Sequence, residues 1–347
     1  MKSLKKSILF LTLFLSVIIV SCTSKPKEEA ASNVKHFRHI QFSETPYDLT
    51  KGIYPLTAEE AKTINNYTFT YNESGKPVSI VYMRGDQVLP GTEKVEISYT
   101  DSTEIHHFFD KDGQPAQSDG VSAFVYKLDE NGNRVGLSFL DKDGNDCPNR
   151  NSISYYIWKV LPDGMVQEKR YNSEGVEVIM NPFCPFFELR FSYDQNGYCT
   201  RMANYMADTL YDCTAENCGE VGVSYFAFEN NAMGALTKFS VFNSHGQMSN
   251  LYWGWSKFEN KVDENGYTIE SFFWDQDNEP LAGKTNPLTI NKYDEHGALI
   301  ERQFMDKNRN LFLREGPNAA VIKYSYDEKG LPVDTTYFDA ALAEVIK

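Results

Sequence analysis

Tyr324-Ser-Tyr-Asp-Glu-Lys-Gly330 is the most informative stretch of the sequence, because close copies of it recur along the chain. Asn291-Lys-Tyr-Asp-Glu-His-Gly297 and Phe191-Ser-Tyr-Asp-Gln-Asn-Gly197 share its order of Tyr, Asp and Gly. The same form, loosest in the last two, is found at Val262–Gly266, Leu128–Gly132, Tyr71–Gly75 and Leu161–Gly164. The aspartates at positions 263, 294 and 327 lie 31 and 33 residues apart. Such a period is the sequence signature of a repeat protein.

A second turn follows 12 residues after the Asp of the first turn in the clearest copies. Asp129 is followed by Asp141, and Asp327 by Asp339. These second turns have an aromatic residue or leucine before Asx-x-x-Gly, as at Phe109–Gly113, Leu140–Gly144, Tyr171–Gly175 and Phe242–Gly246. About eight units of about 32 residues therefore extend from Tyr67 to the C-terminus.

The chemistry of the unit predicts β-hairpins. Asx at the first turn position bonds the backbone two residues on, and Gly at the last position takes the positive φ of a type I turn with a G1 bulge. Between turns, Ile322, Tyr324 and Tyr326 alternate with Lys323 and Ser325, which is the period of a half-buried strand. We predict an all-β fold of tandem antiparallel β-hairpin repeats.

The hairpins should join in one sheet, because a single hairpin is marginal in water and stacking extends one aromatic stripe into a shared core. Twist accumulates over roughly 16 or more strands, so the sheet could coil, fold into two layers or curl towards closure. We expect an elongated twisted sheet. Thr57 and Glu60 form a capping box for a short N-terminal helix over the first edge, and 340–347 could close the other end as a helical turn.

The first 21 residues have the parts of a secretory signal. Lys2, Lys5 and Lys6 precede an apolar run from Ile8 to Val20 that is too short to span a membrane comfortably. Ile18-Ile19-Val20-Ser21-Cys22 resembles the lipobox of bacterial lipoproteins. That resemblance implies cleavage before Cys22, its acylation with diacylglycerol and palmitate, and a lipid bilayer as partner. An ordinary signal peptide with a chance cysteine is the alternative.

Four segments follow from these patterns: a signal peptide at 1–21, a flexible tether at 22–35, an N-terminal cap at 36–66 and the repeat domain at 67–347. The tether is small, polar and charged, which disfavours folding. Its Lys27-Glu28-Glu29 resembles the acidic export tag of Bacteroides-group surface lipoproteins, although a generic linker cluster is as good an explanation. We expect the cell envelope, at the outer membrane, with surface exposure left open.

The charge excludes one class of partner. Loss of residues 1–21 removes three lysines and no acidic residue, so the formal charge falls from −14 to −17. A chain with this much negative charge is not expected to bind nucleic acid.

The five cysteines after Cys22 favour disulfides over metal. Cys213 with Cys218, and Cys184 with Cys199, are two pairs that an oxidising compartment could form, with Cys147 left over. No C-x-x-C is present, so zinc is not expected, and no cofactor is implied. Four of the five lie within 181–222, where the repeat spacing stretches; this is a binding insertion or a degenerate repeat held by disulfides.

The Tyr-Asp-x-x-Gly turns at Tyr193, Tyr293 and Tyr326 resemble the YD repeats of Rhs-type shells. The whole unit also resembles the MORN-like and WG-like hairpin repeats of exported bacterial proteins. These resemblances imply a hairpin-repeat architecture and no particular activity. The period differs from that of YD repeats, which is nearer 20 residues, so a closed shell is not implied.

Enzyme activity finds little support. G-x-S-x-G, H-E-x-x-H and Walker A motifs are absent from the sequence, and His106-His107 lies in a predicted strand. Asp141-Lys-Asp-Gly-Asn-Asp146 invites a calcium site, but position 12 of an EF-hand loop would be Ser152. A pair of glycosidase carboxylates is a matter of spatial separation, which sequence does not show.

The aromatic content is the best indication of binding. Trp253, Trp255 and Trp274 should lie on neighbouring strands, where exposed rings would form a stacking platform for a glycan or an anchor for a protein partner. Burial of these rings in the core is the alternative. Three hypotheses follow: a membrane-anchored binding or scaffold module, a purely structural envelope protein, and a secreted hydrolase.

Overall fold

The computed structural model describes residues 33–346 except 93, 183, 215, 218–221, 253 and 283–285. The predicted signal peptide, Cys22 and most of the tether lie outside the described residues, as do Cys218 and Trp253. Asn33–Lys347 forms one compact unit. Within its described part, no helix is long and apolar enough to cross a membrane.

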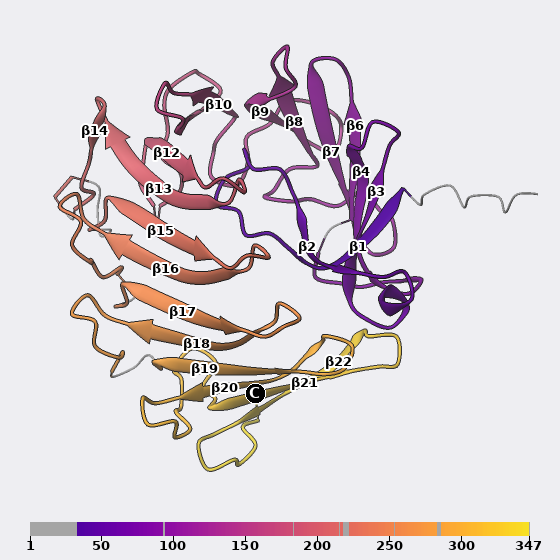
Figure 1. Cartoon of the computed structure of the whole chain (residues 1–347), viewed down its shortest axis with the longest axis vertical. Helices are drawn as coiled ribbons and strands as arrows, with labels where there is room; N and C mark the ends of the chain where they lie inside the picture. Colours follow the sequence, from indigo (N-terminus) through magenta and orange to yellow (C-terminus); the bar gives the residue numbers. More distant parts are fainter. Residues whose placement is uncertain are drawn as a thin grey trace, which may run out of the picture. The chain divides into compact units, whose positions relative to one another are not determined.

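The unit is all-β, and its strands belong to one antiparallel sheet (Figure 1). The strands are β1 (Val34–Ile40), β2 (Gly52–Leu56), β3 (Asn66–Tyr71), β4 (Pro77–Arg84), β5 (Gln87–Val88), β6 (Lys94–Tyr99), β7 (Thr103–Phe109), β8 (Ala123–Leu128), β9 (Arg134–Leu140), β10 (Tyr155–Val160), β11 (Val166–Tyr171), β12 (Glu188–Tyr193), β13 (Cys199–Met206), β14 (Thr209–Leu210), β15 (Tyr225–Asn230), β16 (Leu236–Phe242), β17 (Lys257–Val262), β18 (Thr268–Trp274), β19 (Leu288–Tyr293), β20 (Leu299–Met305), β21 (Val321–Tyr326) and β22 (Pro332–Phe338).

In the described part of the chain, nine hairpins, from β3–β4 to β21–β22, follow one another in chain order, and each pairs with the next. The predicted hairpin-repeat sheet is confirmed. The count exceeds the predicted eight because the β6–β7 turn, Thr100–Thr103, lacks the Asx-to-Gly pattern.

The predicted turn chemistry is present in detail. In the last repeat, Asp327 Oδ1 accepts hydrogen bonds from the backbone N–H of Lys329 at 2.9 Å and of Leu331 at 2.8 Å. Gly330 has a φ of 82°, and the register shifts by one residue between Ser325 and Tyr326. This is the G1 bulge that the pattern predicts.

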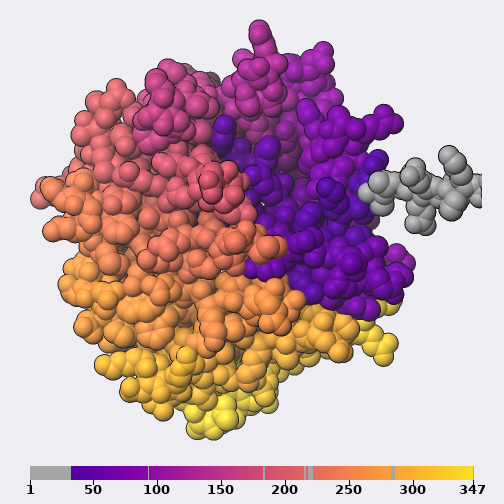
Figure 2. Space-filling model, viewed as in Figure 1, coloured from indigo at the N-terminus to yellow at the C-terminus, as the bar shows by residue number. Residues whose placement is uncertain are grey.

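The first turns of successive hairpins meet the N-terminal segment 38–65. The sheet therefore curls around this segment rather than extending straight, and Figure 2 shows the N-terminal residues, in indigo, lying between earlier and later repeats. The hydrogen bonds that join the two are Tyr193 to Asp48 (2.7 Å), Asn231 to Tyr54 (2.7 Å), His39 to Asn265 (3.1 Å) and His296 to Thr63 (2.8 Å).

The two predicted end helices are reduced or missing. Thr57 and Glu60 form the capping box, with the Thr57 backbone N–H 2.8 Å from Glu60 Oε2, but the helix is one 3-10 turn, η1 (Glu60–Lys62). The N-terminal segment also adds β1 and β2 to the sheet. At the other end, the described part of 340–347 forms a turn and a bridge between Phe338 and Glu344 instead of a helix. A further Asx turn, which begins at Asp339, replaces the helix there.

The cysteine-rich region 181–222 belongs to the sheet through β12 and β13. Cys184 and Cys199 are free thiols, so the predicted pair between them is wrong. Cys213 is disulfide-bonded. Burial raises the pKa of the Cys184 thiol to about 12, so this thiol stays protonated at neutral pH.

Candidate ligand-binding cavity

The two described tryptophans of the predicted platform lie on different faces of the sheet. Trp255 packs edge-on against Phe239, Phe258 and Phe273, at ring distances of 5.5 to 5.7 Å. It borders the main hydrophobic core. Trp255 is partly buried against the core, so it is closer to the alternative of core packing than to an exposed platform.

Trp274 follows Phe273 in β18 and points to the other face, because side chains alternate along a strand. Its ring lies 4.5 Å from that of Phe272, and Lys257 Nζ lies 4.1 Å from its centroid. Trp255 and Trp274 therefore do not form a common surface, and the structure does not bring the predicted site residues together.

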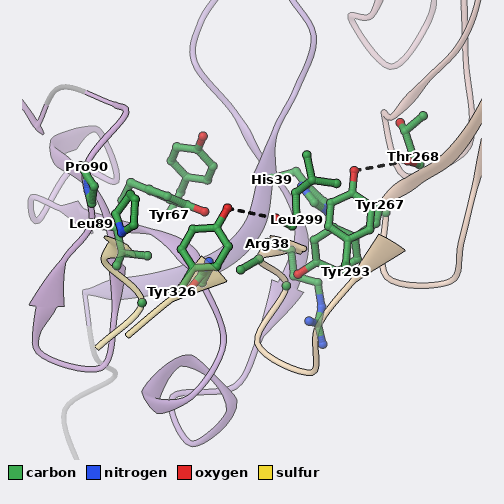
Figure 3. Close-up of a pocket in the computed structure, with 17 residues that line it drawn as sticks. Arg38, His39, Tyr67, Leu89, Pro90, Tyr267, Thr268, Tyr293, Leu299 and Tyr326 are labelled. Atoms are coloured by element: carbon green, nitrogen blue, oxygen red, sulfur yellow. Dashed lines mark hydrogen bonds between the residues drawn. The ribbon is translucent and has the colours of Figure 1, made fainter. Parts of the chain in front are cut away.

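A cavity of about 460 Å³ is instead lined by residues from both ends of the repeat array (Figure 3). β3 and β4 form one side, β19 and β21 with the turn after β17 form the other, and Arg38 and His39 of β1 lie between them. Five tyrosines line it: Tyr67, Tyr82, Tyr267, Tyr293 and Tyr326.

The tyrosine rings form two pairs. The centroids of Tyr67 and Tyr82 are 4.8 Å apart, and those of Tyr267 and Tyr293 are 4.7 Å apart. His39 lies edge-on to Tyr267 at 4.7 Å. Because His39 Nε2 also donates to the Asn265 carbonyl, the second pair is fixed to β1. The ring positions are therefore set by packing before any ligand arrives.

Hydrogen bonds hold two of the hydroxyl groups. Tyr293 donates to the Thr268 carbonyl at 3.2 Å, and Tyr326 donates to the Leu299 carbonyl at 3.0 Å. Each oxygen keeps lone pairs that can accept from a ligand. Burial raises the pKa of Tyr82 to about 12 and also raises the pKa of Tyr293 and Tyr326, so the phenols are neutral at physiological pH.

The remaining polar groups are donors or neutral. Arg38 and Asn65 line the cavity, and no carboxylate side chain is among its described lining residues. Arg38 forms no ion pair within the described part of the chain. Burial raises the pKa of the buried Tyr267 hydroxyl, and the neighbouring Arg38 side chain partly offsets that rise. Arg38 therefore lies beside the tyrosine hydroxyl as a donor group of the cavity.

Sequence reasoning missed this cavity although a signal was present. Tyr293 and Tyr326 are the tyrosines of the recurring Tyr-Asp turns, which the repeat pattern assigned only to hairpin formation. Their convergence with Tyr67 depends on the curl of the sheet, which brings together residues more than 200 positions apart.

Other residues considered for chemistry have structural partners. His106 is buried and its Nε2 lies 2.6 Å from Glu104 Oε1, while Glu104 is also paired with Arg134. Asp141 Oδ1 accepts from the backbone N–H of Asp143 at 2.8 Å and of Asn145 at 2.9 Å, as in the other Asx turns. Among the described residues, no three His, Cys, Asp or Glu side chains are grouped as metal ligands.

No family model matches the sequence, and no curated protein is significantly similar to it. The crystal structures of TcdB2-TccC3-Cdc42 and TcdB2-TccC3-TEV resemble the chain with 11% and 12% identity and a TM-score of 0.31 each. The alignments cover 80% and 79% of this chain and only 14% and 12% of those chains. A porin-like protein from Bacteroides uniformis ATCC 8492 aligns with 9% identity and a TM-score of 0.29, over 78% of this chain and 94% of that one. Similarity this distant carries no information about a ligand.

Proposed function

We propose that this protein is an exported, lipid-anchored binding module that holds a saccharide in the tyrosine-lined cavity. The observation that carries the proposal is the cavity itself: paired aromatic rings from both ends of the array, with Arg38 and Asn65 beside them and no carboxylate in the described lining. Ligand sites commonly combine such apolar walls with a few fixed polar groups, in volumes of about 300–1,000 Å³.

A saccharide suits this combination. Tyrosine offers a flat apolar ring for the C–H face of a sugar and a hydroxyl for its polar edge. The hydroxyls of Tyr293 and Tyr326 are already oriented by backbone carbonyls. Because these groups are ordered in advance, binding requires little further loss of side-chain freedom.

The lipid anchor rests on the sequence alone. The apolar segment and the lipobox-like Ile18–Cys22 support acylation at Cys22 and attachment to the outer membrane. Metabolic labelling with palmitate tests this in cells: the wild-type chain should take up label and fractionate with membranes, and Cys22→Ala should do neither. Absence of label in the wild-type protein would refute the lipid anchor.

Glycan binding is tested with residues 33–347, which form one compact unit. The wild-type domain, the double variant Arg38→Met/Tyr326→Ala and the control Tyr155→Ala are applied to a glycan array, and hits are titrated by calorimetry. Tyr155 stacks on Tyr171 at 5.1 Å away from the cavity. We expect the double variant to bind about ten-fold more weakly and the control to be unchanged. Equal binding by all three proteins, or no binding by the wild type, would refute a saccharide site here.

A further inference from the structure

A second cavity, of about 470 Å³, lies beneath the first hairpins. It shares no lining residue with the tyrosine-lined cavity. Its walls come from β1, β4, β6 and the end of β8, and the N-terminal segment at 49–52 lies along its edge. It is therefore an independent site within the same unit.

The walls of this cavity are apolar. Ile80 and Ile97 are buried, at 4% and 6% exposure, and belong to a small core cluster that Phe37 packs against. Leu128 adds a further buried aliphatic side chain. Tyr99 donates its hydroxyl to the Pro77 carbonyl at 2.9 Å, so its ring is fixed beside them. These surfaces favour an aliphatic ligand over a polar one.

The charged residues that line the interior neutralise one another. Glu104 Oε1 lies 2.6 Å from His106 Nε2 and is also paired with Arg134. Arg134 in turn donates to the Asp48 carbonyl at 2.7 Å and stacks on Tyr126. The cavity therefore has no uncompensated carboxylate that would repel an anionic ligand.

The edge of the cavity carries two cations. Lys51 and Lys76 are exposed, and neither forms an ion pair with any residue that the structure describes. Lys76 Nζ lies 4.9 Å from the centroid of the Tyr99 ring, which keeps the ammonium group at the opening. Leu49, 59% exposed, lies at the same edge. An apolar cavity bordered by two cations, of which Lys51 also acts on the Asp48 carboxylate, matches a ligand with an apolar tail and an anionic head.

We propose that this cavity binds a single-chain amphiphile with an anionic head, of the fatty-acid class. The acyl chain lies between Phe37, Ile80 and Ile97, and the carboxylate lies at Lys51 and Lys76. Each buried methylene should improve the affinity about four-fold, so longer chains bind more tightly until the cavity is full.

The test uses residues 33–347 and the fluorescent probe dansyl-undecanoic acid. We expect saturable binding, displacement by dodecanoate at a concentration at least about ten-fold lower than that needed with octanoate, and weaker displacement by dodecanol. Lys51→Ala/Lys76→Ala should weaken dodecanoate binding about five-fold and leave dodecanol unchanged. The control Lys111→Ala/Lys142→Ala, at two exposed turns, should behave as wild type.

The location is tested with Ile97→Trp, which fills the cavity and should abolish probe binding while circular dichroism stays that of a folded sheet. If this variant does not fold, the location of the site is tested by Lys51→Ala/Lys76→Ala and its control instead. The proposal is overturned by a probe that does not saturate below about 100 µM, by equal displacement with octanoate and dodecanoate, or by unchanged dodecanoate binding in Lys51→Ala/Lys76→Ala. Glycan binding at the other cavity is measured separately, so the two proposals fail independently.

Discussion

Replacement of Arg134 by methionine should be among the most destabilising changes in this protein. The Arg134 side chain is 4% exposed and pairs with Glu104, which is 8% exposed. It also donates to the Pro46 carbonyl at 3.0 Å and the Asp48 carbonyl at 2.7 Å, which ties the sheet to the N-terminal segment. Removing one partner of a buried ion pair costs about 3–5 kcal/mol. We therefore expect the free energy of unfolding to fall by about 4 kcal/mol at pH 7.

The loss should depend on pH. Burial opposes ionisation of Glu104, but His106 and Arg134 outweigh it and lower the pKa from 4.5 to about 2. A carboxylate lowered in this way stabilises the fold above pH 4.5, and that contribution is lost as the pH falls through 2. The difference corresponds to about 3 kcal/mol. Without Arg134, we expect burial to dominate and to raise the pKa of Glu104. Protonation of Glu104 should then restore part of the lost stability of the variant as the pH falls from 7 to 4.

The assay is urea unfolding of residues 33–347 followed by tryptophan fluorescence at pH 7 and pH 4. Arg150→Met is the matched control, because Arg150 is 68% exposed in its ion pair with Asp119 and should contribute less than about 1 kcal/mol. The reasoning is wrong if both variants lose equal stability. It is also wrong if the loss in Arg134→Met is as large at pH 4 as at pH 7.

Three further predictions concern stability. Burial and then Asp48 raise the pKa of Glu44 to about 7, so the contribution of Glu44 to stability is present at low pH and lost above pH 7. Glu44→Gln should therefore raise the melting temperature at pH 8 but not at pH 5. Equal changes at the two pH values would contradict this. Gly297→Ala should cost more than about 2 kcal/mol and Gly75→Ala about 1 kcal/mol in urea unfolding, because an added Cβ collides with the Tyr267 hydroxyl only at Gly297. Similar losses in the two variants would count against the described packing. Trp255→Ala should cost about 3–5 kcal/mol and Trp274→Ala about 1 kcal/mol, and the reverse order would place the wrong ring in the core.

The repeat pattern was sufficient to predict the hairpins, because turn chemistry is local. Asp327 and Gly330 lie three residues apart, and their Asx bonds and positive φ need no other part of the chain. For the same reason, the sequence pattern predicted too few hairpins. The turn at Thr100–Thr103 reverses the chain without the pattern, so its hairpin was not recognised from sequence.

The candidate sites were less predictable. Trp255 and Trp274 come from neighbouring segments, as the sequence suggested. Trp255 precedes β17 and packs on the face of Phe258 and Phe273, whereas Trp274 lies on the opposite face of β18, beside Lys257. The tyrosine-lined cavity combines Tyr67 with Tyr326. No local pattern relates two positions so far apart.

Alternation and turn residues within about 32 positions predict the secondary structure and the antiparallel pairing of neighbouring strands. The curl of the sheet, the turns that contact segment 38–65 and the side chains that share a cavity depend on the tertiary structure. They do so because twist accumulates from small contributions of every strand and is then fixed by long-range contacts such as that of His296 with Thr63.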